Sequence, residues 1–341
     1  MTLETLVSAV KQDMAVQAEK MNLQSDAIII NQCSENSYLE YEYGGNKIKA
    51  YSFAEKGVGL SRNNALLRAK ADIILFSDED IVYHDGYAKQ ILEAFEKHPE
   101  ADMLLFNMNV EADRATYHIE KESRVRFYNS GRYPTYSFAI RREKLHKANI
   151  TFSLLFGGGA KYSNGEDSLF LLECLKKGLK VYALPIEIGK EVPRPSTWFH
   201  GYTEKFFFDR GVLYYYLYGK LRHLMAIRFL LAHKGVMCQE IPVKKAYELC
   251  FPQELIDIIS EYNGEQKLPS TPESALVHII DALIIKLELL ETEVGTSQWN
   301  KEMLIHQTLN DFSGTGIYDK SGMSMNTFIK IRDLLLKEEL L

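Results

Sequence analysis

Short apolar segments alternate with amphipathic segments through the first half of the chain, and no other feature constrains the fold as strongly. Residues 3–10, 26–32 and 101–110 are apolar runs with the length of buried strands. Residues 59–71 and 86–98 instead carry apolar side chains at helical spacing. Strands that alternate with helices are typical of a mostly parallel sheet with helices on its faces. The sequence therefore predicts an α/β protein.

The same pattern continues into the middle of the chain. Further elements are expected at 46–53 (strand), 71–80 (strand), 132–145 (strand leading into a helix), 156–167 (glycine-rich turn), 168–180 (helix) and 181–188 (strand). Ser61 is predicted to be the N-cap of the helix at 59–71.

A change in composition near residue 250 divides the chain. Residues 251–341 have a mainly helical pattern, with a connecting loop expected at 261–273. A chain of 341 residues has the length of about two domains. We therefore expect an α/β domain over residues 1–248 and a helical module over residues 249–341, where homo-oligomer contacts could form.

Composition excludes several classes of protein. Hydrophobic residues make up 46% and charged residues 25%, which are ordinary globular proportions. The net charge of -6 disfavours a general nucleic-acid binder. Four cysteines lie far apart without a C-x-x-C pair, which disfavours a disulfide scaffold or a zinc ribbon. The first residues include acids and lack the apolar core of a signal peptide, so we expect a cytoplasmic protein.

The most apolar stretch runs from Phe206 to Leu231. Charged residues interrupt it, so it fails the criterion of about 18 uncharged residues for a membrane span. Its Tyr, Phe, Lys and Arg content suits a helix that lies on a membrane surface, and equally a buried amphipathic helix with basic edges. Peripheral contact with the inner membrane face is therefore one of two interpretations.

An acidic triplet, Asp78-Glu79-Asp80, follows the apolar run at 73–76. In open parallel sheets, ligands bind beyond the carboxyl ends of the strands. Two carboxylates separated by one residue can share Mg²⁺ or Mn²⁺, which prefer oxygen ligands and bridge to phosphate oxygens. Such triplets are also common in solvated turns, so the position after a buried strand is what favours a metal site.

Three ordered segments resemble the bacterial family-2 glycosyltransferases: KGVGLSRNNALLRAKADIILFSDEDIVY, FGGGAKYSNGEDSLFLLECLKKGLKVYALP and PSTWFHG. The resemblance covers roughly residues 1–248. It implies the GT-A fold, a mostly parallel Rossmann-like sheet that binds a nucleotide-diphospho-sugar. It also implies a metal-dependent, inverting transfer of a sugar to a hydroxyl of a glycan or lipid-linked acceptor.

The resemblance assigns roles to particular residues. Asp78 and Asp80 match the metal-binding acids, with His200 as a third metal ligand and Glu79 beside them at the donor. Glu166 and Asp167 match the catalytic acid pair, with Asp167 as the general base.

Each of these assignments has a structural alternative. Arg62, expected near the base or the phosphates, could be a solvent-facing residue in a first helical turn. Asp167 could cap the following helix, and His200 could pack against Trp198 and Tyr202. Gly157 to Gly159 permit a tight backbone beside the sugar, or form a turn without contacts.

The chain departs from the family where the second strand ends. Asn31 and Gln32 stand where acids commonly hold the uracil or ribose, and amides can bond a base edge without charge. They are therefore predicted donor contacts, with Asp13 as a weaker candidate, and the donor is expected to be UDP-linked.

Two other functions fit parts of the sequence. One is a regulatory module that binds a nucleotide sugar without turnover. The other is a metal phosphohydrolase, because the tail distantly resembles the later helices of HD-domain phosphohydrolases. Asp281 would match one ligand of that site, but the tail has no His-Asp pair to complete it.

Overall fold

The computed structural model describes residues 1–111, 115–193 and 201–252. The chain divides into two units, Met1–Cys250 and Phe251–Leu341, and the fold below is that of the first. The helical pattern after residue 252, Asp281 included, lies outside the described residues.

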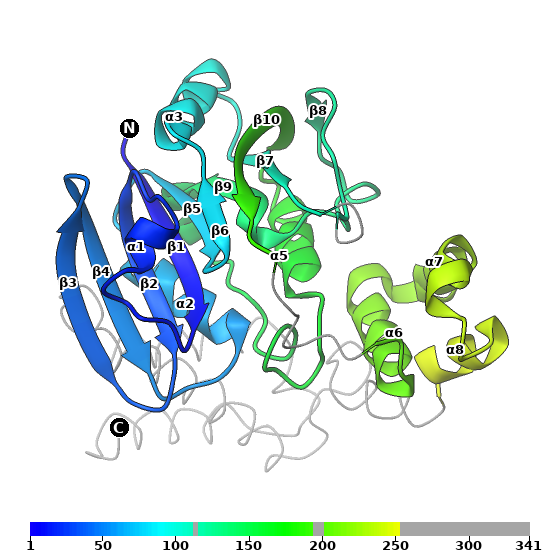
Figure 1. The fold of residues 1–341 in the computed structure, drawn as a ribbon. Coiled ribbons are helices and arrows are strands. Elements are labelled where there is room, and N and C mark those ends of the chain that lie inside the picture. Colours follow the sequence, from blue (N-terminus) through cyan, green and yellow to red (C-terminus); the bar gives the residue numbers. More distant parts are fainter. Residues whose placement is uncertain (112–114, 194–200, 253–341) are drawn as a thin grey trace, which may run out of the picture. The chain divides into compact units, whose positions relative to one another are not determined.

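A ten-stranded mixed sheet forms the centre of the described part of the chain (Figure 1). Its main path runs β3 (Ser37–Tyr43), β4 (Asn46–Phe53), β2 (Asp26–Gln32), β1 (Leu3–Val10), β5 (Ile73–Asp78), β9 (Phe138–Arg141), β7 (Met103–Asn109), β10 (Val181–Glu191) and β6 (Ile81–Tyr83), and β8 (Ser123–Arg124) pairs with β10. The four strands β4, β2, β1 and β5 are parallel neighbours. β9 is antiparallel to both β5 and β7. This mostly parallel α/β arrangement is the predicted fold class.

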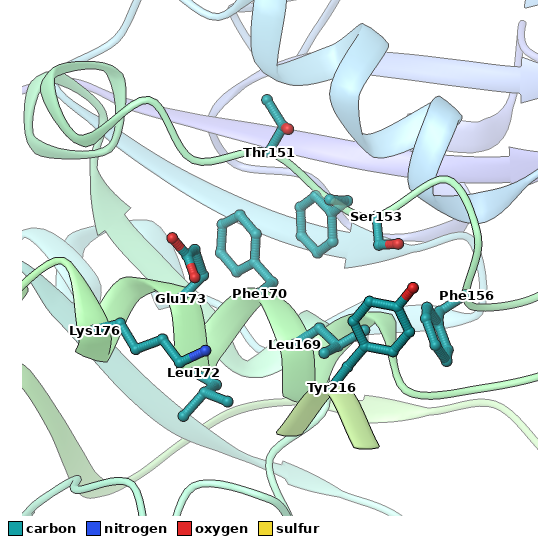
Figure 2. A pocket seen from close by; sticks show the side chains of 10 residues that line it. Thr151, Ser153, Phe156, Leu169, Phe170, Leu172, Glu173, Lys176 and Tyr216 are labelled. Carbon is teal, nitrogen blue, oxygen red and sulfur yellow. The ribbon is translucent and has the colours of Figure 1, made fainter. Parts of the chain in front are cut away.

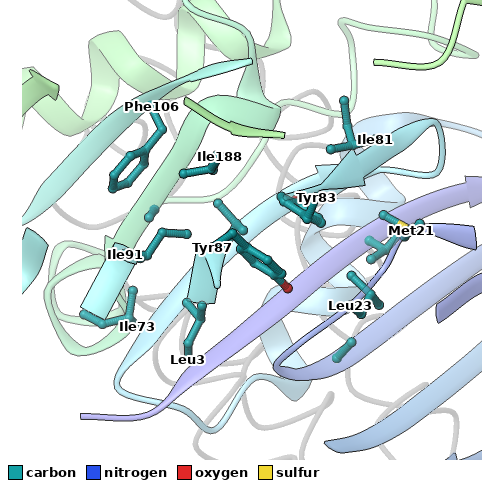
Figure 3. Packing of buried hydrophobic residues seen from close by; sticks show 14 of the residues in the cluster. Leu3, Met21, Leu23, Ile73, Ile81, Tyr83, Tyr87, Ile91, Phe106 and Ile188 are labelled. Atoms are coloured by element: carbon teal, nitrogen blue, oxygen red, sulfur yellow. The ribbon is translucent and has the colours of Figure 1, made fainter. Parts of the chain in front are cut away.

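Successive strand residues point to opposite sides of the sheet, so the apolar strands present buried side chains on both faces. Helices cover both of these faces. On one face Val7 and Ile29 pack with α3 (Tyr87–Lys97), and Figure 3 shows Tyr87 and Ile91 of that helix among the strand side chains. On the other face Leu6 and Ile28 pack with α2 (Val58–Arg68) and α5 (Glu166–Lys176).

The remaining helices are short or follow the sheet. They are α1 (Gln17–Lys20), the 3₁₀ turn η1 (Thr135–Ser137), α4 (Arg142–Ala148), α6 (Glu204–Tyr218), the 3₁₀ turn η2 (Gly219–Leu221), α7 (Arg222–Met237) and α8 (Val243–Cys250). The stretch from Phe206 to Leu231 is therefore divided between two helices. None of the helices in the described ranges is long and apolar enough to cross a bilayer.

The prediction that Ser61 caps its helix is wrong. α2 begins at Val58, after Gly57, whose φ of 133° is a backbone conformation that other residues rarely adopt. Ser61 is consequently one turn inside the helix, where it is buried and its hydroxyl accepts a hydrogen bond from that of Ser8 (2.9 Å).

The helix predicted at 168–180 begins two residues earlier and ends earlier. Gly165, with a φ of 111°, stands before the first turn of α5, and Glu166 and Asp167 belong to that turn. Asp167 is therefore not the N-cap residue of the helix. The helix ends at Lys176, before Gly178 at φ 83°. The following strand extends to Glu191 because its last residues pair with β6.

Candidate active site

The carboxyl ends of β1 and β5 place polar residues together at one edge of the sheet. Asp78 is the last residue of β5 and is paired with Ser8 of β1. Glu79 follows it, and its backbone N–H donates to the Ser8 carbonyl (3.2 Å) while its carbonyl accepts from Gln17 Nε2 (2.8 Å). The Asp80 carbonyl accepts from the Val192 N–H (2.8 Å). These backbone bonds fix the path of the chain through the acidic triplet.

Arg62 joins two acids that are far apart in the sequence. Its Nη2 donates to Asp78 Oδ1 and its Nη1 donates to Glu166 Oε1, both at 3.0 Å. The Arg62 residue is only 5% exposed, and its guanidinium lies 5.4 Å from the centre of the Phe152 ring. It therefore does not face solvent. A buried cation is costly unless it is paired, so these bonds hold α2, β5 and α5 in one arrangement.

Asp167 lies beside this ion-pair network, and its pKa is raised. Burial and the neighbouring Glu166 carboxylate raise the pKa of Asp167 to about 7, although Arg62 and the Ser168 N–H act in the opposite direction. The Ser168 N–H donates to Asp167 Oδ1 at 2.7 Å. A carboxyl group with a pKa near neutrality can accept a proton with more driving force than an ordinary aspartate. Such a group in a cluster of charges is a candidate catalytic base.

The glycine-rich segment before α5 is tied to the rest of the site. Val58 N–H donates to the Gly158 carbonyl (2.9 Å). A Cβ on Gly157 would stand 2.6 Å from Val58 Cγ1 and 2.8 Å from Glu166 Cδ, so the backbone passes too close for any side chain. The turn at 156–167 therefore has defined contacts with both α2 and the acid pair.

A buried aspartate on α6 holds the same segment, and periodicity alone did not identify it. Asp209 is 1% exposed, and its Oδ2 accepts from the N–H and hydroxyl of Ser163 (2.9 and 2.8 Å) and from Lys205 Nζ (2.6 Å). A Cβ on Gly165 would lie 2.4 Å from Leu213 of α6. The sequence did contain a signal for this residue, because Asp209 is an acid within the apolar run that begins at Phe206.

The two amides at the end of β2 have partners inside the protein. Asn31 exchanges hydrogen bonds with the backbone of Gln12 (3.0 and 3.1 Å), and Gln32 Oε1 accepts from the Gly57 N–H (2.6 Å). Both residues are buried. They hold the loop after β1 and the start of α2, and a direct bond to a nucleotide stays a prediction.

The predicted metal ligands are only partly described. Asp78 and Asp80 lie at the strand end, whereas His200 and its neighbour Trp198 lie outside the described residues. Within the described ranges, no three His, Cys, Asp or Glu side chains are arranged to hold a metal. Mg²⁺ commonly needs only one or two carboxylates, with water and substrate phosphates completing its shell. The oxygen donors present fit that mode of binding.

A cavity of about 270 Å³ is lined by Phe152 and Phe170 and mostly by other apolar side chains (Figure 2). Phe152 stacks on Phe170 of α5 with ring centres 4.0 Å apart. Glu173 and Lys176 contribute the charged groups of its lining, and none of the predicted site residues lines it. This cavity is therefore distinct from the candidate active site.

Comparison with known proteins gives a family match for the first part of the chain and a similar fold. Residues 2–158 match the model of Glycosyl transferase family 2. No curated protein matches the sequence significantly. The structure of S. aureus TarS 1-349 in complex with UDP-GlcNAc superposes with a TM-score of 0.53 at 14% identity, covering 86% of this chain and 89% of that one.

Two further structures of S. aureus TarS are also matched. TarS 1-349 in complex with UDP has 14% identity and a TM-score of 0.49 over 83% of this chain and 87% of that one. TarS 1-349 without a named ligand has 12% identity and a TM-score of 0.49 over 86% of this chain and 89% of that one.

Proposed function

Because residues 2–158 match the family 2 glycosyltransferase model and the fold is GT-A, we propose that the chain moves a sugar from a nucleotide-diphospho-sugar to a hydroxyl group by one inverting displacement, with Asp167 as the base. The observation that carries this proposal is the position of Asp167 in the first turn of α5, which Arg62 ties to the carboxyl end of β5 through Glu166 and Asp78. A pKa of Asp167 raised by burial to about 7 suits a base at this position. A sugar hydroxyl is a poor nucleophile until its proton is removed.

In the proposed step, Asp167 accepts the proton of the acceptor hydroxyl. The acceptor oxygen forms a bond to the anomeric carbon from the face opposite the leaving group. The bond from that carbon to the phosphate oxygen breaks, and the nucleoside diphosphate departs with the electron pair. One displacement inverts the anomeric configuration, and a single carboxylate base is sufficient for it.

Asp78 and Asp80 support the leaving-group side of this scheme. They supply oxygen donors at the end of a parallel strand, where ligands bind in open α/β sheets. We propose that they hold Mg²⁺ or Mn²⁺, with His200 as a further ligand. When bound, such an ion neutralises charge on the diphosphate. Arg62, paired with both Asp78 and Glu166, positions the two sides of the site relative to each other.

The donor is proposed to be UDP-linked. The fold shared with S. aureus TarS, whose structure contains UDP-GlcNAc, supports a uridine nucleotide. Asn31 and Gln32 contribute by holding the backbone at Gln12 and Gly57, next to the expected nucleotide site. Glu79 lies beside Asp78 and is a further donor contact in this proposal. The acceptor is a hydroxyl of a glycan, free or lipid-linked.

Acceptor-dependent release of nucleoside diphosphate tests this function. The full chain is incubated with UDP-GlcNAc and other nucleotide sugars, with Mn²⁺, Mg²⁺ or EDTA, and with a set of glycan acceptors. We expect release that depends on the ion and on one donor, and a product with inverted anomeric configuration by NMR. Donor binding without transfer or hydrolysis under any condition would contradict the proposal and favour a regulatory binding role. A product with retained configuration would exclude the single displacement.

A further inference from the structure

The helix α7 leaves an apolar stripe facing solvent. Leu224, Ile227 and Leu231 are 63%, 44% and 54% exposed, and their spacing of three and four residues puts them on one side of the helix. The opposite side is buried through Ala226 and Leu230. The helix is therefore packed on one face and presents a second apolar face outward.

The Lys and Arg side chains of α7 are not accompanied by acids within the helix. Arg228 and Lys234 are both exposed. By helical spacing, the two residues lie on opposite edges of the apolar stripe. Between residues 218 and 238 the sequence has four Lys and Arg and no Asp or Glu, although the whole chain carries a net charge of -6. A basic helix in an acidic protein favours an anionic partner.

A second element adds exposed aromatic side chains. Phe127 and Tyr128 are 65% and 71% exposed, and Arg126 and Arg132 beside them are exposed as well. This loop lies against the C-terminal end of α6, because the Tyr218 hydroxyl is 3.5 Å from where a Cβ on Gly131 would stand. α7 begins a few residues after that point.

We propose that α7 and the loop at 126–132 dock onto the surface of an anionic lipid bilayer. An exposed apolar stripe flanked by Lys and Arg, without acids, is the arrangement of helices that lie in the membrane interface. Aromatic side chains with neighbouring cations suit the headgroup level. A protein partner would need acidic side chains placed opposite these cations, whereas an anionic bilayer carries negative headgroups over its whole surface. This inference goes beyond the proposed transfer reaction and does not depend on it.

Vesicle sedimentation with the full chain tests the proposal. Vesicles of phosphatidylcholine alone are compared with vesicles containing about 30% phosphatidylglycerol, in low and high salt. We expect binding only to the anionic vesicles, with a strong decrease in high salt. Leu231→Asp should reduce the partition coefficient at least about tenfold, because aspartate is excluded from the apolar interface. Arg228→Glu with Lys234→Glu should reduce it by roughly fivefold or more for each charge.

Leu39→Asp is the matched control, since Leu39 is also exposed, on the edge strand β3. It should bind vesicles like the wild type, and the thermal unfolding of all variants shows whether they remain folded. Equal binding to neutral and anionic vesicles, or unchanged binding by Leu231→Asp, would overturn the proposal. A dimer of the wild type that Leu231→Asp converts to a monomer, without vesicle binding, would assign the stripe to a second copy of the chain instead.

Discussion

The guanidinium of Arg62 balances acids from two different parts of the chain. It bonds to Asp78 and Glu166 and also lowers the pKa of Asp167, whereas burial and the Glu166 carboxylate raise it. The acidity of the proposed base thus depends on residues that do not themselves take the proton. Changing either neighbour should move the pKa of Asp167 in a known direction.

Opposite shifts are expected for Arg62→Gln and Glu166→Gln. The pH dependence of kcat/KM reports groups of the free enzyme, so the acidic limb of the wild type should fall near pH 7. Arg62→Gln removes the stabilising cation and should move this limb to higher pH. Glu166→Gln removes a repelling carboxylate and should move it to lower pH. Arg62→Lys is the control that retains the charge. Equal shifts in one direction would contradict this electrostatic account.

Asp167→Asn should also change the pH dependence of stability. The pKa of Asp167 is raised from 3.8 to about 7, so its favourable contribution to folding is complete below about pH 4 and is lost as the pH rises through 7. Asparagine carries no charge to desolvate. Thermal or urea unfolding at pH 8 should therefore show the variant more stable than wild type by on the order of 2 kcal/mol, with little gain at pH 4. An equal gain in stability at pH 4 and pH 8 would contradict the explanation that the gain comes from removing the buried charge of Asp167.

The individual acids could be predicted from sequence, but their connection could not. Asp78 follows an apolar strand and was visible as a local pattern, whereas Glu166 and Asp167 were identified through the resemblance to the family. The bond between Arg62 and Glu166 joins residues 104 positions apart, and no local pattern reports such a contact. The alternative of a solvent-facing Arg62 is wrong for the same reason, because the residues that surround it, Phe152, Asp78 and Glu166 among them, are distant in the sequence.

At the scale of elements, α6 holds the start of α5 through Asp209. Because its Oδ2 accepts two bonds from Ser163, it fixes the segment that leads into Glu166 and Asp167. Asp209 is therefore a positioning residue for the proposed base, and its removal should affect the chemical step more than donor binding.

Asp209→Ala should lower kcat with little change in donor affinity. It leaves the Ser163 N–H without its acceptor, at a cost of about 1 to 3 kcal/mol in the free energy of unfolding. Lys205→Ala is the matched control, since the Lys205 side chain is 62% exposed and its pair with Asp209 contributes less. Kinetics with calorimetric donor binding makes the comparison. A loss of donor affinity equal to the loss of kcat would contradict a positioning role.

The elements that sequence predicted well are those with continuous apolar runs. Strands at Leu3–Val10, Asp26–Gln32 and Asn46–Phe53 have the predicted bounds. The prediction omitted the edge strand β3 and the short strands β6 and β8. β3 is an edge strand with mostly exposed side chains, so it lacks the apolar signal, and its order depends on pairing with β4. β6 has only three residues and exists through its pairing with β10.

At the scale of the described unit, the residues proposed to bind the donor and the residue proposed to remove the proton lie on different elements. The ends of β1 and β5 carry Asp78 and the segment that leads to Asp80, whereas α5 carries Asp167. Because Arg62 connects the two sides, the site is assembled only when α2, β5 and α5 are packed together. A substitution confined to Asp167 should therefore leave the donor half intact.

Single-turnover transfer by Asp167→Asn, measured together with calorimetric binding of the donor, tests this division most directly. The account predicts that kcat falls by about 10²- to 10⁴-fold while the donor dissociation constant stays close to that of the wild type. Transfer by the variant within a few-fold of the wild-type rate would contradict the assignment of Asp167 as the base.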